Sequence, residues 1–96
     1  MNQSVALKKT EAERLLPVGW KLSEDEQAIS RRYKFENFIQ ALEFVNKVGA
    51  EAEKANHHPD LTLGWGYVGV TYTTHDAGGL TEKDFAMAAK TDLQNA

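Results

Sequence analysis

The sequence contains no cysteine, and its 96 residues include only three histidines. Without cysteine, disulfide bonds, thiolate nucleophiles and zinc–thiolate sites are excluded. A basic excess is also missing, since 11 Lys and Arg stand against 14 Asp and Glu, so no nucleic-acid partner is expected. No apolar run has the length of a signal peptide or a membrane span, which predicts a cytoplasmic protein without a membrane partner.

The rest of the composition is that of an ordinary globular protein, with 42% hydrophobic and 26% charged residues. The length predicts a single domain over residues 1–96. A chain of this size buries only roughly 60–65% of its unfolded surface, so self-association would add useful stability.

Capping pairs predict three helices. In each pair, the first side chain can accept a hydrogen bond from the backbone N–H of the residue three positions later. The side chain of that later residue can accept one from the backbone N–H of the first residue. The pairs are Thr10 with Glu13, Asn37 with Gln40, and Thr81 with Asp84. The first helix should stop near Pro17 and the second just before His57.

The second helix is expected to be long and amphipathic. Apolar or small residues recur along it at helical spacing, which predicts one buried stripe. The predicted stripe consists of Phe38, Leu42, Val45, Gly49 and Ala52.

Between these helices the hydrophobic period falls to two. Residues 28–35 and 68–73 alternate between apolar and polar side chains and are predicted to be half-buried strands. Segments 20–22 and 61–65 are their expected partners, the second pair turning at Gly64 or Gly66. The order α-β-β-α-β-β-α with two hairpins predicts a two-layer α+β fold, an antiparallel sheet covered by helices on one face.

All three histidines fall within residues 57–75. The residue before a proline avoids the helical region, so His58, which precedes Pro59, should leave the helix end in a different direction from His57. Glu53 lies about one helical turn before His57 and is expected to hold that imidazole in one tautomer. A hairpin over residues 61–74 would bring His75 back toward the pair.

Three imidazoles in one cleft favour proton transfer, because an unperturbed histidine titrates at about pH 6.5. A neutral ring and a protonated ring together can serve as base and acid, as an elimination or isomerisation requires. The competing interpretations are surface histidines, which are common, and a zinc site with three histidines. No HExxH spacing is present and the adjacent rings diverge, so no metal is expected.

Two further residues have simple explanations. Asp84 is explained as a helix cap, and Trp65 as a core or rim aromatic that could wall a flat substrate.

Together these features resemble one known family. The pattern Glu53-x-x-x-His57-His58-Pro59, followed by an aromatic residue, His75 and an aspartate, is similar to that of the pterin-4a-carbinolamine dehydratases. Residues 19–20, 35–38 and 74–82 also match, so the resemblance covers roughly residues 10–93. The chain departs from the family at residues 63–67, which are glycine-rich where many relatives carry polar residues.

The resemblance implies a four-stranded antiparallel sheet with three helices on one face, and a homodimer or homotetramer. It implies loss of water from a 4a-hydroxytetrahydropterin to give the quinonoid dihydropterin, which recycles the pterin used by aromatic amino-acid hydroxylases. No metal or organic cofactor is implied.

The resemblance also assigns roles to residues. His57 and His75 would be the acid/base pair, and His58 would bind and orient the substrate with some share in proton transfer. Glu53 would hold His57. Pterin contacts would come from Asn56, His58, Thr73, Thr74 and Asp76.

An alternative within the same fold is a non-catalytic interaction or assembly module. The resemblance includes proteins that stabilise dimers of a transcription factor or assist assembly of a carbon-fixing enzyme. The assembly relatives tend to lose part of the histidine set, and this chain keeps all three histidines, which favours the enzyme.

Overall fold

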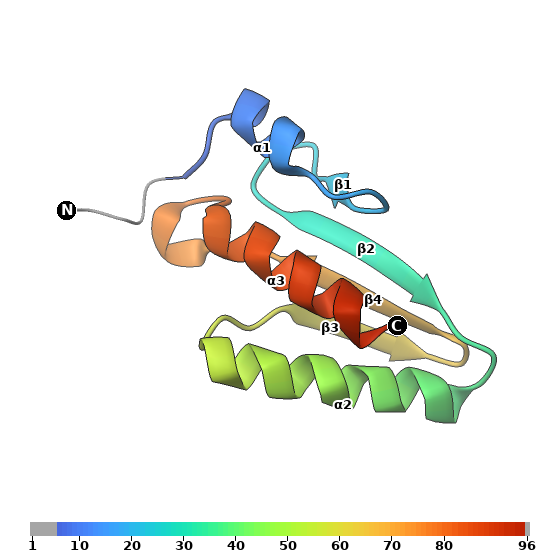
Figure 1. Ribbon diagram of the computed structural model, residues 1–96. Coiled ribbons are helices and arrows are strands. Elements are labelled where there is room, and N and C mark those ends of the chain that lie inside the picture. Colours follow the sequence, from blue (N-terminus) through green and yellow to red (C-terminus); the bar gives the residue numbers. More distant parts are fainter. Residues whose placement is uncertain (1–5, 96) are drawn as a thin grey trace.

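A computed structural model describes residues 6–95, and its element order confirms the predicted α-β-β-α-β-β-α arrangement. One four-stranded antiparallel sheet carries the helices, with α2 and α3 packed side by side on it (Figure 1). A short 3-10 helix, η1, was not predicted. The elements are α1 (Lys9–Leu15), β1 (Lys21–Leu22), β2 (Ile29–Lys34), α2 (Phe38–Ala55), β3 (Asp60–Gly64), β4 (Tyr67–Tyr72), η1 (His75–Ala77) and α3 (Glu82–Gln94).

The strands lie in the order β1-β2-β4-β3, so β2 and β4 form the centre of the sheet. Ile29 pairs with Tyr72 and Tyr33 with Val68, which places all four side chains on the face that the helices cover. The period of two in the sequence therefore identified the buried face correctly. Within residues 6–95, no helix is both long and apolar enough to cross a membrane.

The start of α2 is confirmed and its predicted buried stripe is wrong. Asn37 caps the helix by accepting a hydrogen bond from the Gln40 N–H at 2.9 Å. Of the predicted stripe only Ala52 is fully buried, and Phe38 is 42% exposed. The residues that pack on the sheet form the neighbouring stripe, Ala41, Phe44, Val48 and Ala52.

Aromatic packing explains this rotation of α2. The Phe44 ring lies 4.6 Å from the Tyr33 ring and 5.1 Å from the Phe35 ring, between centroids. Such pairs add stability beyond the area they bury. Both stripes are apolar enough to face a core, so periodicity alone could not select between them.

The predicted cap of the first helix is also wrong, because α1 begins at Lys9 rather than after Thr10. The Glu11 carboxylate accepts a hydrogen bond from the Lys8 N–H at 3.4 Å. Just before the helix, the Leu7 N–H bonds to the Leu80 carbonyl at 2.7 Å. This long-range bond orients the chain ahead of the position that the local capping pattern indicated.

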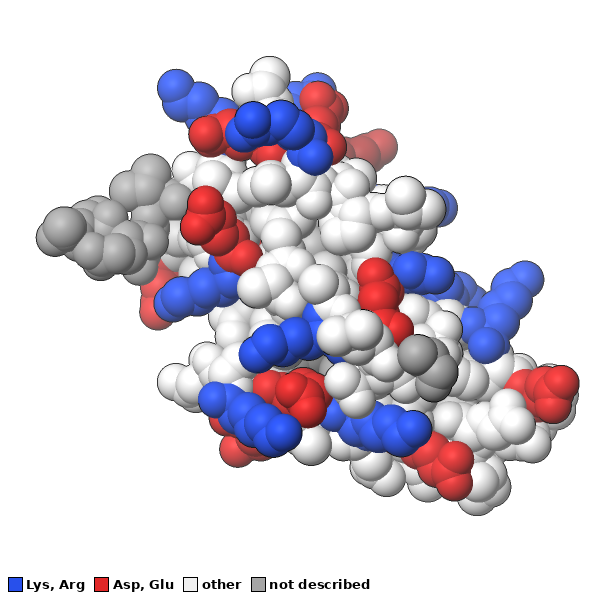
Figure 2. Space-filling model, viewed as in Figure 1, with Lys and Arg blue, Asp and Glu red and all other residues white. Residues whose placement is uncertain are grey.

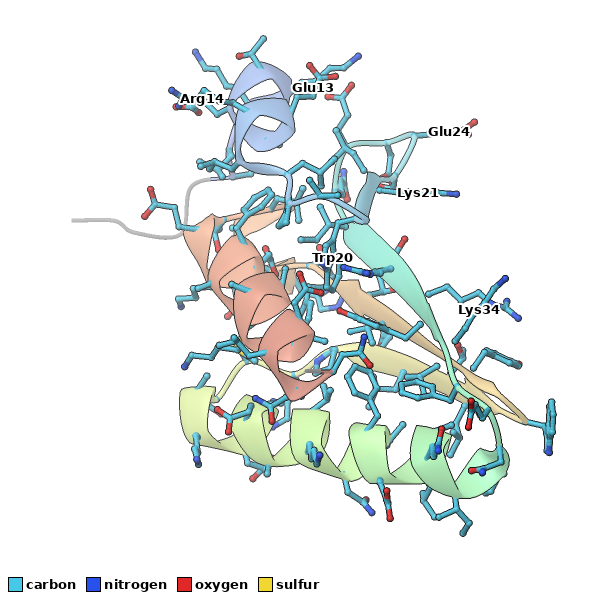
Figure 3. All side chains as sticks on the ribbon, turned by 45° about the vertical axis from the view of Figure 1, so that its right-hand side comes forward. Glu13, Arg14, Trp20, Lys21, Glu24 and Lys34 are labelled. Carbon is cyan, nitrogen blue, oxygen red and sulfur yellow. The ribbon has the colours of Figure 1, made fainter. Side chains whose placement is uncertain are left out.

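The end of α3 is tied to the sheet by Asp92. Its carboxylate accepts hydrogen bonds from Trp20 Nε1 at 3.2 Å, from Arg31 at 3.1 Å and from the Tyr33 hydroxyl. In Figure 3 the Trp20 side chain lies between α3 and β2. Burial and the neighbouring Asp92 charge raise the pKa of Tyr33, so its hydroxyl remains a donor to the carboxylate.

One residue of the loop between β1 and β2 has an unfavourable backbone conformation. Glu26 has φ of 64°, in the left-handed region that costs a residue with a side chain roughly 1–2 kcal/mol. Its ion pair with Lys9, at 3.6 Å, is exposed and contributes little.

We expect Glu26→Gly to raise the free energy of unfolding by about 0.5–1 kcal/mol, since glycine adopts positive φ freely and loses part of this gain as chain entropy. Urea unfolding followed by circular dichroism measures the change. Glu24→Gly is the control, because Glu24 lies in the same loop at negative φ and should lower stability. Equal effects of the two substitutions would contradict the explanation.

Candidate active site

The three histidines lie around one open cavity of about 370 Å³. The cavity forms where the end of α2 and the start of α3 come together on one side of the molecule (Figure 1). Its volume falls within the usual range for small-molecule sites. The lining residues are Asn56, His57, His58, Thr73, Thr74, His75, Asp76 and Lys83.

The end of α2 directs the histidine pair toward the cavity. Asn56 terminates the helix in the left-handed conformation, with φ of 52° and ψ of 42°. Asparagine tolerates this conformation better than most residues. The His57 N–H then bonds back to the Ala52 carbonyl at 3.2 Å. This closed turn sends the chain sharply away from the helix axis at His57.

His57 is held by a buried carboxylate from a distant part of the chain. Its Nε2 lies 2.6 Å from Asp84 Oδ1, and the Asp84 side chain is fully buried. The other carboxylate oxygen accepts hydrogen bonds from the Thr81 N–H at 2.9 Å and the Thr74 hydroxyl at 2.8 Å. Asp84 is therefore the predicted cap of α3 and also the residue that orients His57.

The prediction that Glu53 holds His57 is wrong. Glu53 instead contacts His58 Nε2, and both side chains of this pair are exposed, by 77% and 54%. The turn at Asn56 rotates His57 toward the interior and leaves His58 on the side of α2 that carries Glu53. An exposed pair of this kind contributes little stability.

His75 reaches the cavity from the other chain segment, as the hairpin prediction required. It is the first residue of η1, which Thr73 and Thr74 separate from the end of β4, and its side chain is exposed. The backbone bridge between Thr74 and Gly79 closes the loop that carries it. The chain segments before Pro59 and after Tyr72 therefore meet at one site.

The predicted pterin contacts differ in what they can offer a ligand. The Thr74 hydroxyl is occupied by Asp84 and Thr81, and the Thr73 hydroxyl donates to the Gln27 carbonyl. Asn56 and Asp76 are exposed, and no side-chain hydrogen bond is formed by either within residues 6–95. Their exposed polar atoms can meet a bound molecule.

An aromatic ring supports His57 from the core. The Tyr72 ring stacks on the imidazole at a centroid distance of 6.2 Å and an interplanar angle of 10°. The Tyr72 hydroxyl is hydrogen bonded to Thr91 at 2.7 Å. Burial raises the pKa of Tyr72, and the Asp84 charge adds to this rise. Tyr72 is thus a neutral, buried packing partner of His57 rather than a base.

Two further residues need correction or addition. Trp65 does not wall the cavity, because it lies in the turn between β3 and β4, beyond the opposite end of β4 from His75, and is 73% exposed. Lys83 lines the cavity and was not predicted. Its signal in the sequence is a cation in the first turn of α3, where the helix dipole disfavours positive charge. In the described part of the chain, no three His, Asp or Glu side chains are grouped to hold a metal ion.

Comparison with known proteins places this geometry in a family. The family model for pterin 4 alpha carbinolamine dehydratase matches residues 5–94. The chain belongs to this family. A dehydratase-family protein of Rubrobacter xylanophilus, named provisionally as a pterin-4-alpha-carbinolamine dehydratase, is 52% identical over 89 residues, which are 90% of this chain and 81% of the relative. A similarly named protein of Halorhodospira halophila is 52% identical over 77 residues, 80% of this chain and 71% of the relative.

Solved structures agree with the family assignment. The transcriptional coactivator/pterin dehydratase from Brucella melitensis superposes with a TM-score of 0.85 at 35% identity, covering 95% of this chain and 99% of that one. A pterin dehydratase-like protein identified as a RuBisCO assembly factor in the alpha-carboxysome superposes with a TM-score of 0.69 at 25% identity. That match covers 79% of this chain and 88% of the other.

The two carboxylate–imidazole pairs should differ strongly in their contribution to stability. We expect Asp84→Asn to lower the free energy of unfolding by about 1–3 kcal/mol, since it weakens buried hydrogen bonds to a charged acceptor. Glu53→Gln is the matched control and should change stability by less than about 0.5 kcal/mol, because its pair is exposed. Urea unfolding of both variants tests this, and losses of equal size would show that Asp84 does not anchor the site.

Proposed function

We propose that the protein removes water from a 4a-hydroxytetrahydropterin, giving the quinonoid dihydropterin and thereby recycling a pterin for aromatic amino-acid hydroxylases. The observation that carries this proposal is the cavity lined by three imidazoles, one of them held by the buried Asp84. Family membership supports the pterin as substrate class. No metal or organic cofactor enters the proposed reaction.

The reaction needs one proton delivered and one proton removed. The C4a–O bond breaks as an acid protonates the hydroxyl, which leaves as water, and a base takes a proton from a ring nitrogen. The two transfers balance, so the enzyme needs two groups that exchange protons near neutral pH. His57 and His75, on opposite chain segments of the cavity, supply this pair.

The hydrogen bonds around His57 suit this role. With its Nε2–H donated to the Asp84 carboxylate, the Nδ1 atom is left to take up or release the catalytic proton. Asp84 acts through His57 and is a positioning residue. His58, with Glu53 beside it, has a place at the rim from which it can orient the substrate and share in proton transfer.

The remaining polar groups of the cavity are suited to the edge of a pterin ring. Asn56 offers an amide with donor and acceptor atoms, and Asp76 offers a carboxylate that can accept two N–H bonds. Thr73 contributes backbone groups, since its hydroxyl already has a partner. The hydroxyl of Thr74 is also occupied, and its N–H and carbonyl are bonded within the loop to Gly79 and Ala77, so Thr74 shapes the cavity rather than binding the ring directly.

The catalytic assignment is tested kinetically. A hydroxylase generates the 4a-hydroxypterin, and its decay is followed by ultraviolet absorbance with and without the protein. We expect His57→Ala and His75→Ala each to lower the protein-dependent rate by at least about tenfold, the low end of the effect of one acid/base group.

A surface substitution, Lys34→Gln, is the control and should leave the rate unchanged. Circular dichroism monitors folding, because removal of His57 takes a partner from the buried Asp84. Parent rates in both histidine variants would refute the assignment. Absence of any acceleration by the parent protein would favour the alternative, a non-catalytic interaction or assembly module, which the likeness to a RuBisCO assembly factor keeps open.

We further propose that the protein is a homodimer or homotetramer. Strand β3 is an edge of the sheet, and beside it α2 carries a partly exposed stripe that consists of Phe38, Leu42, Val45 and Gly49. Val45 and Leu61 line a hollow of about 550 Å³ between these elements. An apolar hollow next to a free strand edge is typical of an association surface.

The association surface is tested by Val45→Glu, which places a charge in the hollow and should convert the assembly to a monomer. Light scattering after size-exclusion chromatography measures the mass. Leu93→Glu is the control, since Leu93 is 70% exposed on α3 and should leave the mass unchanged. A parent protein that is already monomeric would overturn this part of the proposal.

A further inference from the structure

A second, smaller pocket adjoins the histidine cavity. Its volume is about 150 Å³, and it lies between the end of α2 and the exposed side of α3. His57 and Lys83 line both this pocket and the histidine cavity, so these two side chains form the wall between them. The other lining residues are Ala55, Ala86, Met87 and Lys90.

Small side chains create this pocket. Ala55 on α2 and Ala86 on α3 leave space between the two helices that longer side chains would fill. Met87, which is 2% exposed, forms the apolar base of the pocket. A substituent that projects from a ring bound at the histidines could reach this pocket by running past the side chains of His57 and Lys83, which border both spaces.

Two lysines give the pocket its chemical character. Lys83, Met87 and Lys90 lie at spacings of four and three residues along one face of α3, and the two lysine Cα atoms are separated by about 10.5 Å along the helix. Flexible lysine side chains at this distance can converge on one group bound between them. Figure 2 shows basic side chains where α3 faces α2.

Neither ammonium group has an ion-pair partner in the described part of the chain. Among residues 6–95, no ion pair involves Lys83 or Lys90, whereas the nearby Lys54 is paired with Glu51 at 3.3 Å. Lys83 also stands in the first turn of α3 against the helix dipole. When a residue is locally unfavourable and lies beside a site, it is expected to contribute to the function of that site.

We propose that this pocket is a subsite for an anionic substituent, a phosphate or a carboxylate, carried by the pterin ring. This inference rests on the proposed function, since it assumes that the ring occupies the histidine cavity. Lys83 and Lys90 pair with the anion, and Ala55, Ala86 and Met87 contact the carbon chain that joins it to the ring. The substrate class is thereby narrowed to pterins with a short, negatively charged side chain.

Two ligands that differ only in charge and one ester group test the subsite by binding, without catalysis. The probes are 6-hydroxymethyl-7,8-dihydropterin and its phosphate ester, titrated by isothermal calorimetry. We expect the parent protein to bind the ester at least about tenfold more tightly, through charge-assisted hydrogen bonds. The preference should shrink as salt is raised, because the pocket is open to solvent.

Substitutions assign the preference to the pocket. Lys90→Gln should reduce the ratio of the two affinities to within about twofold of unity, and Ala86→Leu should do the same by filling the space. Lys34→Gln removes an equal charge from the opposite side of the sheet and should keep the parent ratio. In Figure 3 the Lys34 side chain points away from α3.

The outcomes separate the two proposals. Dehydratase activity together with equal binding of both ligands, or a preference that survives Lys90→Gln, would overturn the subsite alone. A phosphate preference that Lys90→Gln removes, in a protein without dehydratase activity, would support the subsite and overturn only the proposed reaction. If neither ligand binds, the subsite proposal fails, and the kinetic assay alone decides the proposed reaction.

Discussion

The buried carboxylate of Asp84 is the interaction on which the site depends. One side chain caps α3 through the Thr81 N–H, ties the chain after β4 through Thr74, and holds His57 at the end of α2. A fully buried charge is costly unless it is paired and hydrogen bonded. Loss of any one of these three hydrogen bonds would lower stability. The three bonds therefore keep the end of α2, the chain after β4 and the start of α3 in one relative position.

This arrangement gives neighbouring histidines different environments. The His57 side chain is 13% exposed, packed on Tyr72 and bonded to Asp84, whereas the His58 side chain is 54% exposed and contacts the exposed carboxylate of Glu53. A held ring can keep one tautomer through a reaction, and an exposed ring can adjust to a ligand. Adjacent residues of the same type are thus suited to different tasks, because the backbone turns between them.

The small pocket between α2 and α3 extends the site beyond the histidines. Alanines at Ala55 and Ala86 allow α2 and α3 to approach without closing the space beside His57, and α3 carries Lys83 and Lys90 along that space. The same two helices therefore position the reacting groups and border the pocket proposed to select the substrate. The rest of α3 is held in place by Asp92, which bonds to Trp20, Arg31 and Tyr33 at the far end of the helix.

Much of the fold, and the meeting of the histidines at one site, could be predicted from the sequence. Capping at Asn37 and Thr81, the alternation along β2 and β4, and the collection of three histidines at one cavity all follow from spacing, because local hydrogen bonds and side-chain period depend on near neighbours. The buried stripe of α2 and the start of α1 could not be predicted, since each depended on contacts with residues far along the chain. The contact between the Phe44 and Tyr33 rings selects the buried stripe of α2. The hydrogen bond from the Leu7 N–H to the Leu80 carbonyl fixes the chain before α1.

The sequence by itself determined which residue types were available and in what order: three imidazoles, two nearby carboxylates and the turn before Pro59. Only the tertiary structure decided which carboxylate meets which imidazole. Glu53 was the nearer in sequence to His57, but the left-handed turn at Asn56 directs His57 inward to Asp84 and leaves Glu53 with His58. Spacing along a helix specifies a shared face only while the helix continues, and this helix ends between the residues concerned.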